Sequence, residues 1–124
     1  MTLSEFITPL EVRMLPESTN GQSWVLISPL AYRSFLADSI ITVPSGFITD
    51  FVSFEPLKNV GQRAAVLHDF LYSCEDVDRK FADRLLHEAL DSVGVNRILA
   101  DIMYEAVRLF GGGHRERIYR LSAI

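Results

Sequence analysis

The residues best suited to chemistry lie in the segment AAVLHDFLYS, residues 64–73, where His68 and Asp69 are adjacent and Tyr72 follows. The rest of the segment is apolar, and an ionised carboxylate is costly to bury unless it pairs, binds a metal or takes up a proton. On a helix, His68 and Tyr72 share a face, and Asp69 projects about a quarter-turn away. The segment therefore predicts an imidazole that transfers a proton and a carboxylate that binds a cation or a substrate donor.

A second acid is expected within reach of this imidazole. Asp83 lies in RKFADRLLHEALDSV, and only the short polar break CEDVD separates this segment from the previous one. A short connection favours two antiparallel neighbouring helices, so Asp83 could hydrogen-bond His68 and fix its tautomer. His87 follows Asp83 by four residues, so these two form a further i, i+4 pair, for which a solvated or salt-bridged helix face is the alternative interpretation.

A third acid, Asp50, lies in the otherwise apolar stretch VPSGFITDFVSFEPL, residues 43–57. Loops normally run over the surface, so a polar group inside an apolar loop suggests a site. Asp50 is therefore a candidate cation ligand, and capping of a local turn is its alternative role. For His68 and its acidic neighbours the alternative is a hydrogen-bonded structural network in the core. Cys74, the one cysteine, has no cationic surroundings in the sequence and is predicted to be inert.

The second half of the chain has the periodicity of three helices. The first runs from about residue 62 to 73 and is apolar enough to be buried, whereas the next two repeat apolar residues at 3.6-residue spacing. Asp76 or Asp78 is the expected N-cap of the second helix, and Asn96 that of the third. Gly94 suits the end of the second helix, and the third stops at the glycines that begin with Gly111.

The first half of the chain has the pattern of strands. PLEVRML alternates, with Leu10, Val12 and Met14 on one face, and SWVLISPL and SIITVP are expected as the next two strands, the former interrupted by Pro29. The fold class is therefore α+β: a small antiparallel sheet or hairpin of two or three strands, packed through its Leu10, Val12 and Met14 face on three α-helices.

The expected organisation is a single α+β domain over residues 1–113 and a basic C-terminal tail over residues 114–124. The tail HRERIYRLSAI follows a triple glycine, and a segment this short is a marginal helix by itself in water. It is therefore expected to become ordered only by docking, either on its own domain or on a partner, including a second copy of the chain.

Composition narrows the classes of function. The chain has 124 residues, a net charge of −4 and a pI near 5.3, which disfavours a generic nucleic-acid binder. A single cysteine allows no intramolecular disulfide and no four-cysteine zinc site. No apolar run approaches the roughly 18–20 residues of a membrane span, and the first residues lack the pattern of a signal peptide.

Three of these segments, VPSGFITDFVSFEP, AAVLHDFLYS and FADRLLHEAL, together with MYEAVRLFGG, resemble a family of small phage and prophage proteins known as domain of unknown function 1353. The resemblance extends from about Phe6 to Gly111. It implies a tailed-phage or prophage origin and no particular activity. The expected location is then the host cytoplasm or the assembled phage particle.

A narrower resemblance concerns mechanism. HDFLY followed by FADRLL is similar to the His-Asp-x-x-Tyr helix and the later Asp of phospholipases A2. It implies that His68 is the general base for a water, Asp69 a ligand of Ca²⁺, Asp83 the residue that orients His68, and Tyr72 a support for that pair. Those enzymes also use a Gly-rich calcium loop, for which this chain offers only PSGFITD, and Asp50 is the conjectured replacement ligand.

Three functions follow as hypotheses. The first is a small calcium-type esterase or hydrolase that acts on a lipid or another ester of the host envelope. The second is a virion or assembly component whose polar cluster is a structural network and which binds other phage proteins or itself through residues 114–124. The third is an accessory protein that inactivates a host protein by binding it.

Overall fold

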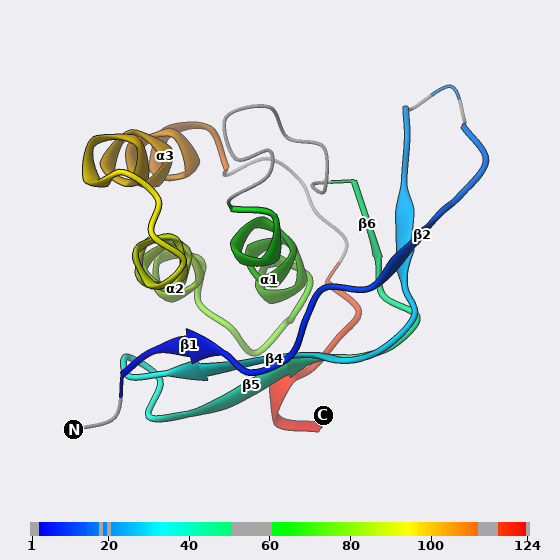
Figure 1. Cartoon of the computed structure of the whole chain (residues 1–124), viewed down its shortest axis with the longest axis horizontal. Helices are drawn as coiled ribbons and strands as arrows, with labels where there is room; N and C mark the ends of the chain where they lie inside the picture. The colour runs from blue at the N-terminus through cyan, green and yellow to red at the C-terminus, as the bar shows by residue number, and fades with distance from the viewer. Residues whose placement is uncertain (1–2, 18, 20, 51–60, 112–116, 124) are drawn as a thin grey trace.

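The computed structural model describes residues 3–17, 19, 21–50, 61–111 and 117–123. Strands occupy the first half of the chain and helices the second, which confirms the α+β fold class (Figure 1). The strands are β1 Glu5–Phe6, β2 Val12–Met14, β3 Trp24–Leu26, β4 Leu30–Ser34, β5 Ser39–Val43 and β6 Ile48–Thr49. The helices are α1 Gln62–Tyr72, α2 Arg79–Ser92 and α3 Arg97–Phe110, followed by a short 3₁₀ turn, Leu121–Ala123.

The three helices begin and end close to the expected residues. Asp78 caps α2 by accepting a hydrogen bond from the Phe81 amide, and Asn96 caps α3 through the amides of Ile98 and Leu99. Gly94 follows α2 with φ of +82°, a conformation that glycine adopts without strain. None of the described helices is both long and apolar enough to cross a membrane.

The strands form two small antiparallel sheets, with strand orders β1-β4-β5 and β2-β3-β6. The β4–β5 hairpin is the longest pairing and runs from Leu30 opposite Val43 to Ser34 opposite Ser39. Along β4, buried and half-buried residues alternate, because one face of the sheet covers the helices. The first sheet therefore supplies the floor of the core.

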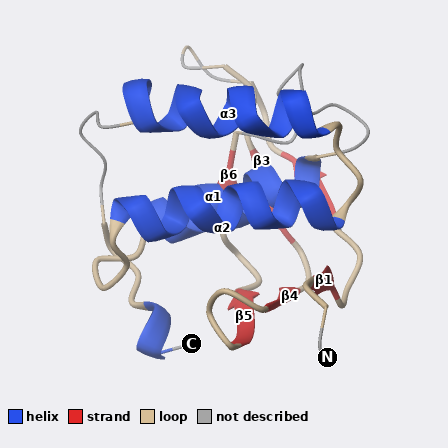
Figure 2. Cartoon of the chain, turned by 90° about the vertical axis from the view of Figure 1, so that its left-hand side faces the viewer, coloured by secondary structure: helices blue, strands red, loops and turns tan. Residues whose placement is uncertain are grey.

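The helices stack in layers on this floor. In Figure 2, α1 and α2 lie side by side between the β1-β4-β5 sheet below and α3 above. All residues of α1 from Ala64 to Tyr72 are buried, so α1 is the central element of the fold. The predicted burial of this helix is confirmed, and its polar residues must find their partners inside the protein.

The sequence correctly predicted antiparallel strands in the first half of the chain, but several details of that prediction were wrong. The predicted pairing of the first two strands is confirmed, since Val12 lies opposite Leu26 and Met14 opposite Trp24. Leu10 and Val12 pack against the core, but Met14 is 65% exposed, so the predicted apolar face loses its last member. The second predicted strand is in fact two, because the chain turns at Ser28 and Pro29 and enters the other sheet.

The described part of the tail, residues 117–123, docks on its own domain. Tyr119 pairs with Cys74, and its ring packs on the rings of Phe47 and Phe70. The Arg117 guanidinium donates to the carbonyls of Cys74 and Val77. Of the two expected modes of docking, these residues adopt the intramolecular one.

Candidate functional site

Asp83 is the centre of a polar network that joins all three helices. Its side chain is fully buried, and its Oδ1 accepts hydrogen bonds from His68 Nε2, at 2.8 Å, and from the Tyr72 hydroxyl. Its Oδ2 accepts a hydrogen bond from the Arg108 guanidinium at 2.8 Å. His68 and Tyr72 belong to α1, Asp83 to α2 and Arg108 to α3. The predicted convergence of His68, Tyr72 and Asp83 is therefore present in the structure.

The surroundings of Asp83 keep it ionised. Burial alone would raise the pKa of this carboxyl, but the hydrogen bonds from His68, Tyr72 and Arg108 outweigh burial and lower the pKa below its usual range. The pKa values of two of its partners, Tyr72 and Arg108, are instead raised. The pKa of Tyr72 is raised by burial and by the adjacent carboxylate, and the pKa of Arg108 is raised by its bond to Asp83. Tyr72 is thus a hydrogen-bond donor rather than an acid in this site.

An ionised Asp83 fixes the proton on the His68 ring. The carboxylate can only accept, so the Nε2 atom of a neutral His68 carries the hydrogen and Nδ1 carries the lone pair. The Tyr72 ring packs against the imidazole, with ring centroids 4.2 Å apart. His68 is therefore held in one tautomer and one orientation, which is what a general base requires.

The last turn of α3 supports this network from outside. Arg108 reaches Asp83, and the Arg79 guanidinium donates to the carbonyls of Val107 and Arg108 at this helix end. Gly111 follows the helix at a place where a side chain would collide with the site: an added Cβ would lie 2.6 Å from the Tyr72 hydroxyl. The helix end and the Tyr72 side chain therefore fit each other closely.

The two predicted metal ligands differ in their surroundings. Asp69 is buried, at 3% exposure, beside His68 in α1. Asp50 is exposed and follows β6 immediately. The described residues contain no cluster of three or more His, Cys, Asp or Glu side chains able to hold a metal ion. The structure therefore places one buried carboxylate beside His68 and does not bring Asp50 to it through any described contact.

The segment PSGFITD, the candidate calcium loop, makes backbone hydrogen bonds to the neighbouring strand β3. Gly46 has φ of +91° in a turn, and its amide donates to the carbonyl of Leu26. The carbonyl of Phe47 accepts from the Leu26 amide, and the Phe47 ring is buried against Phe70. These groups join β3 to β6. The donors among the described residues therefore do not complete an oxygen cage for Ca²⁺, which needs six to eight ligands.

Asp83 and His87, four residues apart on α2, have different partners, and His87 takes the salt-bridged helix-face position of the alternative interpretation. Asp83 faces the α1–α3 side, whereas His87 Nε2 lies 2.7 Å from Asp101 Oδ1 on α3 and contacts the ring of Tyr104. The described residues therefore contain two His–Asp pairs with different surroundings. Cys74 is buried and its thiol pKa is raised to about 12, chiefly by burial, which fits the prediction of an inert thiol.

Three residues of the network were not expected from the sequence. Arg108 and Gly111 lie 25 and 28 positions after Asp83, and Arg79 is the first residue of α2. The sequence offered one indication for Arg108: it follows Val107, an apolar residue on the core side of an amphipathic helix. A buried acid on a neighbouring helix requires a cationic partner, and Arg108 is placed to supply it. Gly111 carried no signal beyond ending a helix.

A protein-family model matches residues 24–107, which cover β3 through nearly the whole of α3. The chain belongs to the family described as Protein of unknown function (DUF1353). His68, Asp69, Tyr72 and Asp83 all lie within the matched region of this DUF1353 member, and Arg108 follows it directly. No curated protein and no solved structure matches the chain. The resemblance to phospholipases A2 therefore stays a prediction.

Proposed function

We propose that this DUF1353 protein is a small hydrolase of carboxylic esters, with His68 as the general base and Asp83 as the residue that orients it. The observation that supports the proposal is the bond between His68 Nε2 and the fully buried carboxylate of Asp83, at 2.8 Å. Such a pair holds the imidazole in the tautomer that accepts a proton at Nδ1.

The reaction follows from this tautomer. His68 Nδ1 removes a proton from a water while the water oxygen attacks the ester carbonyl carbon. The positive charge that forms on the imidazole is stabilised by Asp83 across the Nε2 hydrogen bond. When the tetrahedral intermediate collapses, the same proton passes from Nδ1 to the leaving alkoxide. The products are a carboxylic acid and an alcohol, and His68 returns to its neutral form.

Arg108 and Tyr72 set the charge and geometry of the base. Tyr72 donates to the same Asp83 oxygen as His68, so the carboxylate cannot turn away from the ring. Arg108 neutralises the Asp83 charge from the other oxygen. With Arg108 bound at Oδ2, the Oδ1 atom of Asp83 stays directed at His68 Nε2. Only the neutral form of His68 can act as the base.

The substrate and the setting rest on the two resemblances. A phospholipase-like activity would act on the ester bonds of host envelope lipids, and a phage or prophage origin would place the protein in the host cytoplasm or in the phage particle. Calcium is a separate proposal that rests on the buried Asp69 carboxylate. No step above passes through a metal, because the described donors do not form a complete site.

The second His–Asp pair provides the matched control for an experiment. The purified chain and its His68→Asn, Asp83→Asn, His87→Asn and Asp101→Asn variants would be assayed on p-nitrophenyl esters and on phosphatidylglycerol vesicles, with and without Ca²⁺. We expect hydrolysis by the unchanged chain, and a loss of about 10²–10⁴-fold in His68→Asn, which is the usual contribution of a general base. The His87 and Asp101 variants should retain full activity.

Two outcomes would remove the hydrolase proposal. The first is hydrolysis that His68→Asn leaves intact, since the base would then be another group. The second is no ester hydrolysis by a folded, unchanged chain under any of these conditions. Circular dichroism of each variant separates loss of chemistry from loss of fold.

A structural network is the second candidate, because one observation favours it. Asp83 receives hydrogen bonds from donors on two other helices: those from His68 and Tyr72 are buried, and that from Arg108 is partly buried. A fully satisfied network of this kind specifies one packing of three helices without any chemistry. On this reading the protein is a virion, assembly or host-binding component. Loss of folding in Asp83→Asn together with no activity in the unchanged chain would support it.

A further inference from the structure

The outward side of α3 carries apolar residues that nothing in the described chain covers. Ile98, Ile102 and Leu109 are 71%, 57% and 72% exposed. Their spacing of four and seven residues places them in one line along the helix, here named the α3 crest. Isolated apolar residues on a surface are ordinary, but an ordered line of large ones marks a contact surface.

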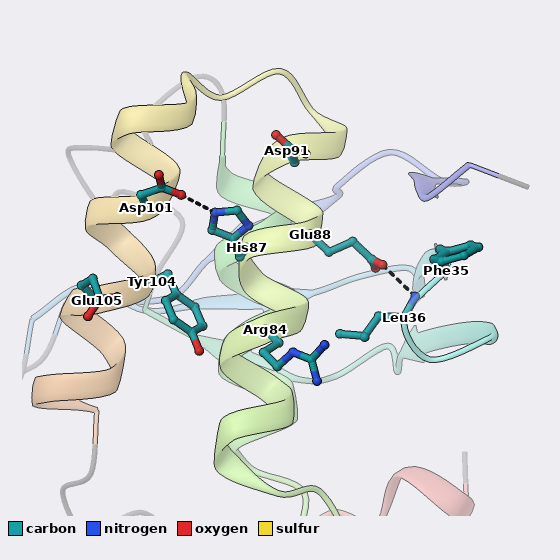
Figure 3. Close-up of a pocket in the computed structure, with 9 residues that line it drawn as sticks. All are labelled: Phe35, Leu36, Arg84, His87, Glu88, Asp91, Asp101, Tyr104 and Glu105. Carbon is teal, nitrogen blue, oxygen red and sulfur yellow. Dashed lines mark hydrogen bonds and ion pairs between the residues drawn. The ribbon is translucent and has the colours of Figure 1, made fainter.

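Beside the α3 crest lies a groove whose floor is the outward face of α2. It has a volume of about 640 Å³, and its two walls are α3 and the turn between β4 and β5 (Figure 3). Here it is named the α2 groove. Its lining residues are Phe35, Leu36, Arg84, His87, Glu88, Asp91, Asp101, Tyr104 and Glu105.

The α2 groove concentrates negative charge. Four carboxylates and one guanidinium line it, so its formal charge is −3 with His87 neutral, against −4 for the whole chain. Asp91 and Glu105 form no ion pair within the described residues. At the rim, Phe35 is 69% exposed on a turn that Glu88 anchors through the Leu36 amide. An exposed aromatic ring on an anchored turn suits contact with an apolar or cationic side chain.

We propose that the α3 crest and the α2 groove together bind a basic amphipathic segment of another protein. The apolar side of such a segment would cover Ile98, Ile102 and Leu109, and its lysine or arginine side chains would reach Asp101, Glu105 and Asp91. The argument is charge complementarity next to an uncovered apolar helix face. It is independent of the hydrolase proposal, because none of these residues touches His68 or Asp83 through a described contact.

A second copy of this chain fits the same surface poorly. A symmetric contact through two α3 crests would bring two grooves of charge −3 towards each other. Like charges that face each other across an interface oppose association. The basic segment that the structure describes outside the helices, residues 117–123, is docked on the α1–α2 connection. A basic partner is therefore the better occupant.

The proposal can be tested with one peptide pair and two variant pairs. The probe is a fluorescent 16-residue helical peptide of leucine and lysine, and its control replaces every lysine by glutamate. The charge variant is Asp101→Lys with Glu105→Lys, matched by Glu11→Lys with Glu17→Lys, which makes the same change in net charge at exposed acids elsewhere. The apolar variant is Ile102→Gln with Leu109→Gln, matched by Met14→Gln at another exposed apolar residue.

We expect the lysine peptide to bind the unchanged chain, and the glutamate peptide to bind at least about tenfold more weakly. The Asp101 and Glu105 variant and the Ile102 and Leu109 variant should each weaken binding about tenfold or more, and both matched controls should leave it unchanged. Equal weakening by both charge variants would overturn the proposal, since net charge alone would then explain binding. So would a dimer in sedimentation that Ile102→Gln with Leu109→Gln dissociates, because the surface would then serve self-association.

Discussion

Two His–Asp pairs in the part of the chain that the structure describes have nearly the same bond length and very different surroundings. His68 Nε2 lies 2.8 Å from Asp83 Oδ1, and the two side chains are 7% and 0% exposed. His87 and Asp101 lie 2.7 Å apart, with side chains 32% and 60% exposed. The first pair also has Tyr72 and Arg108 on its carboxylate, whereas the second faces the open α2 groove.

The difference shows that distance alone does not define a site. In water, an ion pair gains little because solvent screens the charges and the side chains lose freedom. In a buried place the same contact is stronger, but it must offset the loss of hydration, which requires further donors. Among the described residues, Asp83 has such further donors in Tyr72 and Arg108, whereas Asp101 has a described bond to His87 alone. The buried pair is therefore the one able to hold a base in a fixed orientation.

The largest expected effect is on stability when the buried pair is broken. Asp83→Asn removes the charge that compensates Arg108 and accepts from His68, so we expect a loss of about 3 kcal/mol in the free energy of unfolding. Asp101→Asn should change it by no more than about 0.5 kcal/mol. Urea titration of both variants measures the difference. Equal losses would show that burial does not separate the two pairs.

The pH dependence of this effect follows from the lowered pKa of Asp83. A carboxyl whose pKa is lower in the folded than in the unfolded state stabilises the fold fully above its unfolded pKa, and the stabilisation is lost as pH falls through the folded pKa. The stability gap between the unchanged chain and Asp83→Asn should therefore be constant near neutral pH and shrink below about pH 4. A gap that persists at the lowest pH would contradict the ionised state of Asp83.

Calcium gives the next largest expected effect if Asp69 is a ligand beside the buried pair. Ca²⁺ at a hundredfold excess over its Kd would raise stability by about 2.7 kcal/mol, since a ligand of the folded state stabilises it by mass action. Thermal melts with and without Ca²⁺ measure this rise, and Asp69→Asn should abolish it. A melting temperature that millimolar Ca²⁺, Mg²⁺, Mn²⁺ and Zn²⁺ all leave unchanged would end the metal proposal.

A smaller effect is expected from the tight fit of Gly111. In Gly111→Ala, the new methyl would lie 2.5 Å from the Val107 carbonyl oxygen and 2.6 Å from the Tyr72 hydroxyl. Overpacking of this kind costs about 1–2 kcal/mol, and it should also move Tyr72 away from Asp83. Ultraviolet titration should then show the Tyr72 pKa falling back towards its ordinary value.

The control for this variant is Gly94→Ala. Gly94 has φ of +82° and open space around it, so alanine there should cost about 1 kcal/mol through backbone strain alone. Its tyrosine titration should match that of the unchanged chain. If both variants titrate alike, the helix end does not position Tyr72.

The smallest effect concerns the exposed pair. Because His87 and Asp101 are accessible to solvent, the ion pair that they form when His87 is protonated should contribute at most about 0.5 kcal/mol. This contribution should vanish in 1 M salt, where the screening length is about 3 Å. A double-mutant cycle of His87→Asn and Asp101→Asn, measured at low and high salt, tests this expectation. A coupling energy between His87 and Asp101 that is the same at low and high salt would contradict this expectation, because solvent would then not screen the pair.

The helices were predictable because their signals are local. The 3.6-residue pattern and the caps at Asp78 and Asn96 fix each helix within a few residues. The convergence of His68 and Asp83 also followed, since a short connection forces α1 and α2 to lie side by side. The strands were less predictable, because the chain changes sheets at Pro29 and Met14 passes beyond the edge of the core.

The rest of the site depends on contacts that sequence spacing does not encode. Arg108 meets Asp83 only because α3 returns along α2 in one register, and several registers would have satisfied the same apolar pattern. His87 was paired with Asp83 on spacing alone, whereas the structure offers it Asp101 from the facing helix. His87 therefore bonds to a residue of the facing helix α3 and not to the residue four positions earlier on its own helix.

The Glu88 carboxylate bonds α2 to the β1-β4-β5 sheet. It accepts hydrogen bonds from the Tyr32 hydroxyl, the Ser34 hydroxyl and the Leu36 amide, all on β4 or the turn that follows it. Five residues earlier on the same helix, Asp83 bonds to α1 and α3. The β1-β4-β5 sheet and the other two helices are thus each bonded to α2, so we expect them to open as one cooperative unit in native-state hydrogen exchange. The Leu36 amide, although it lies in a surface turn, should then exchange with solvent only when that unit opens.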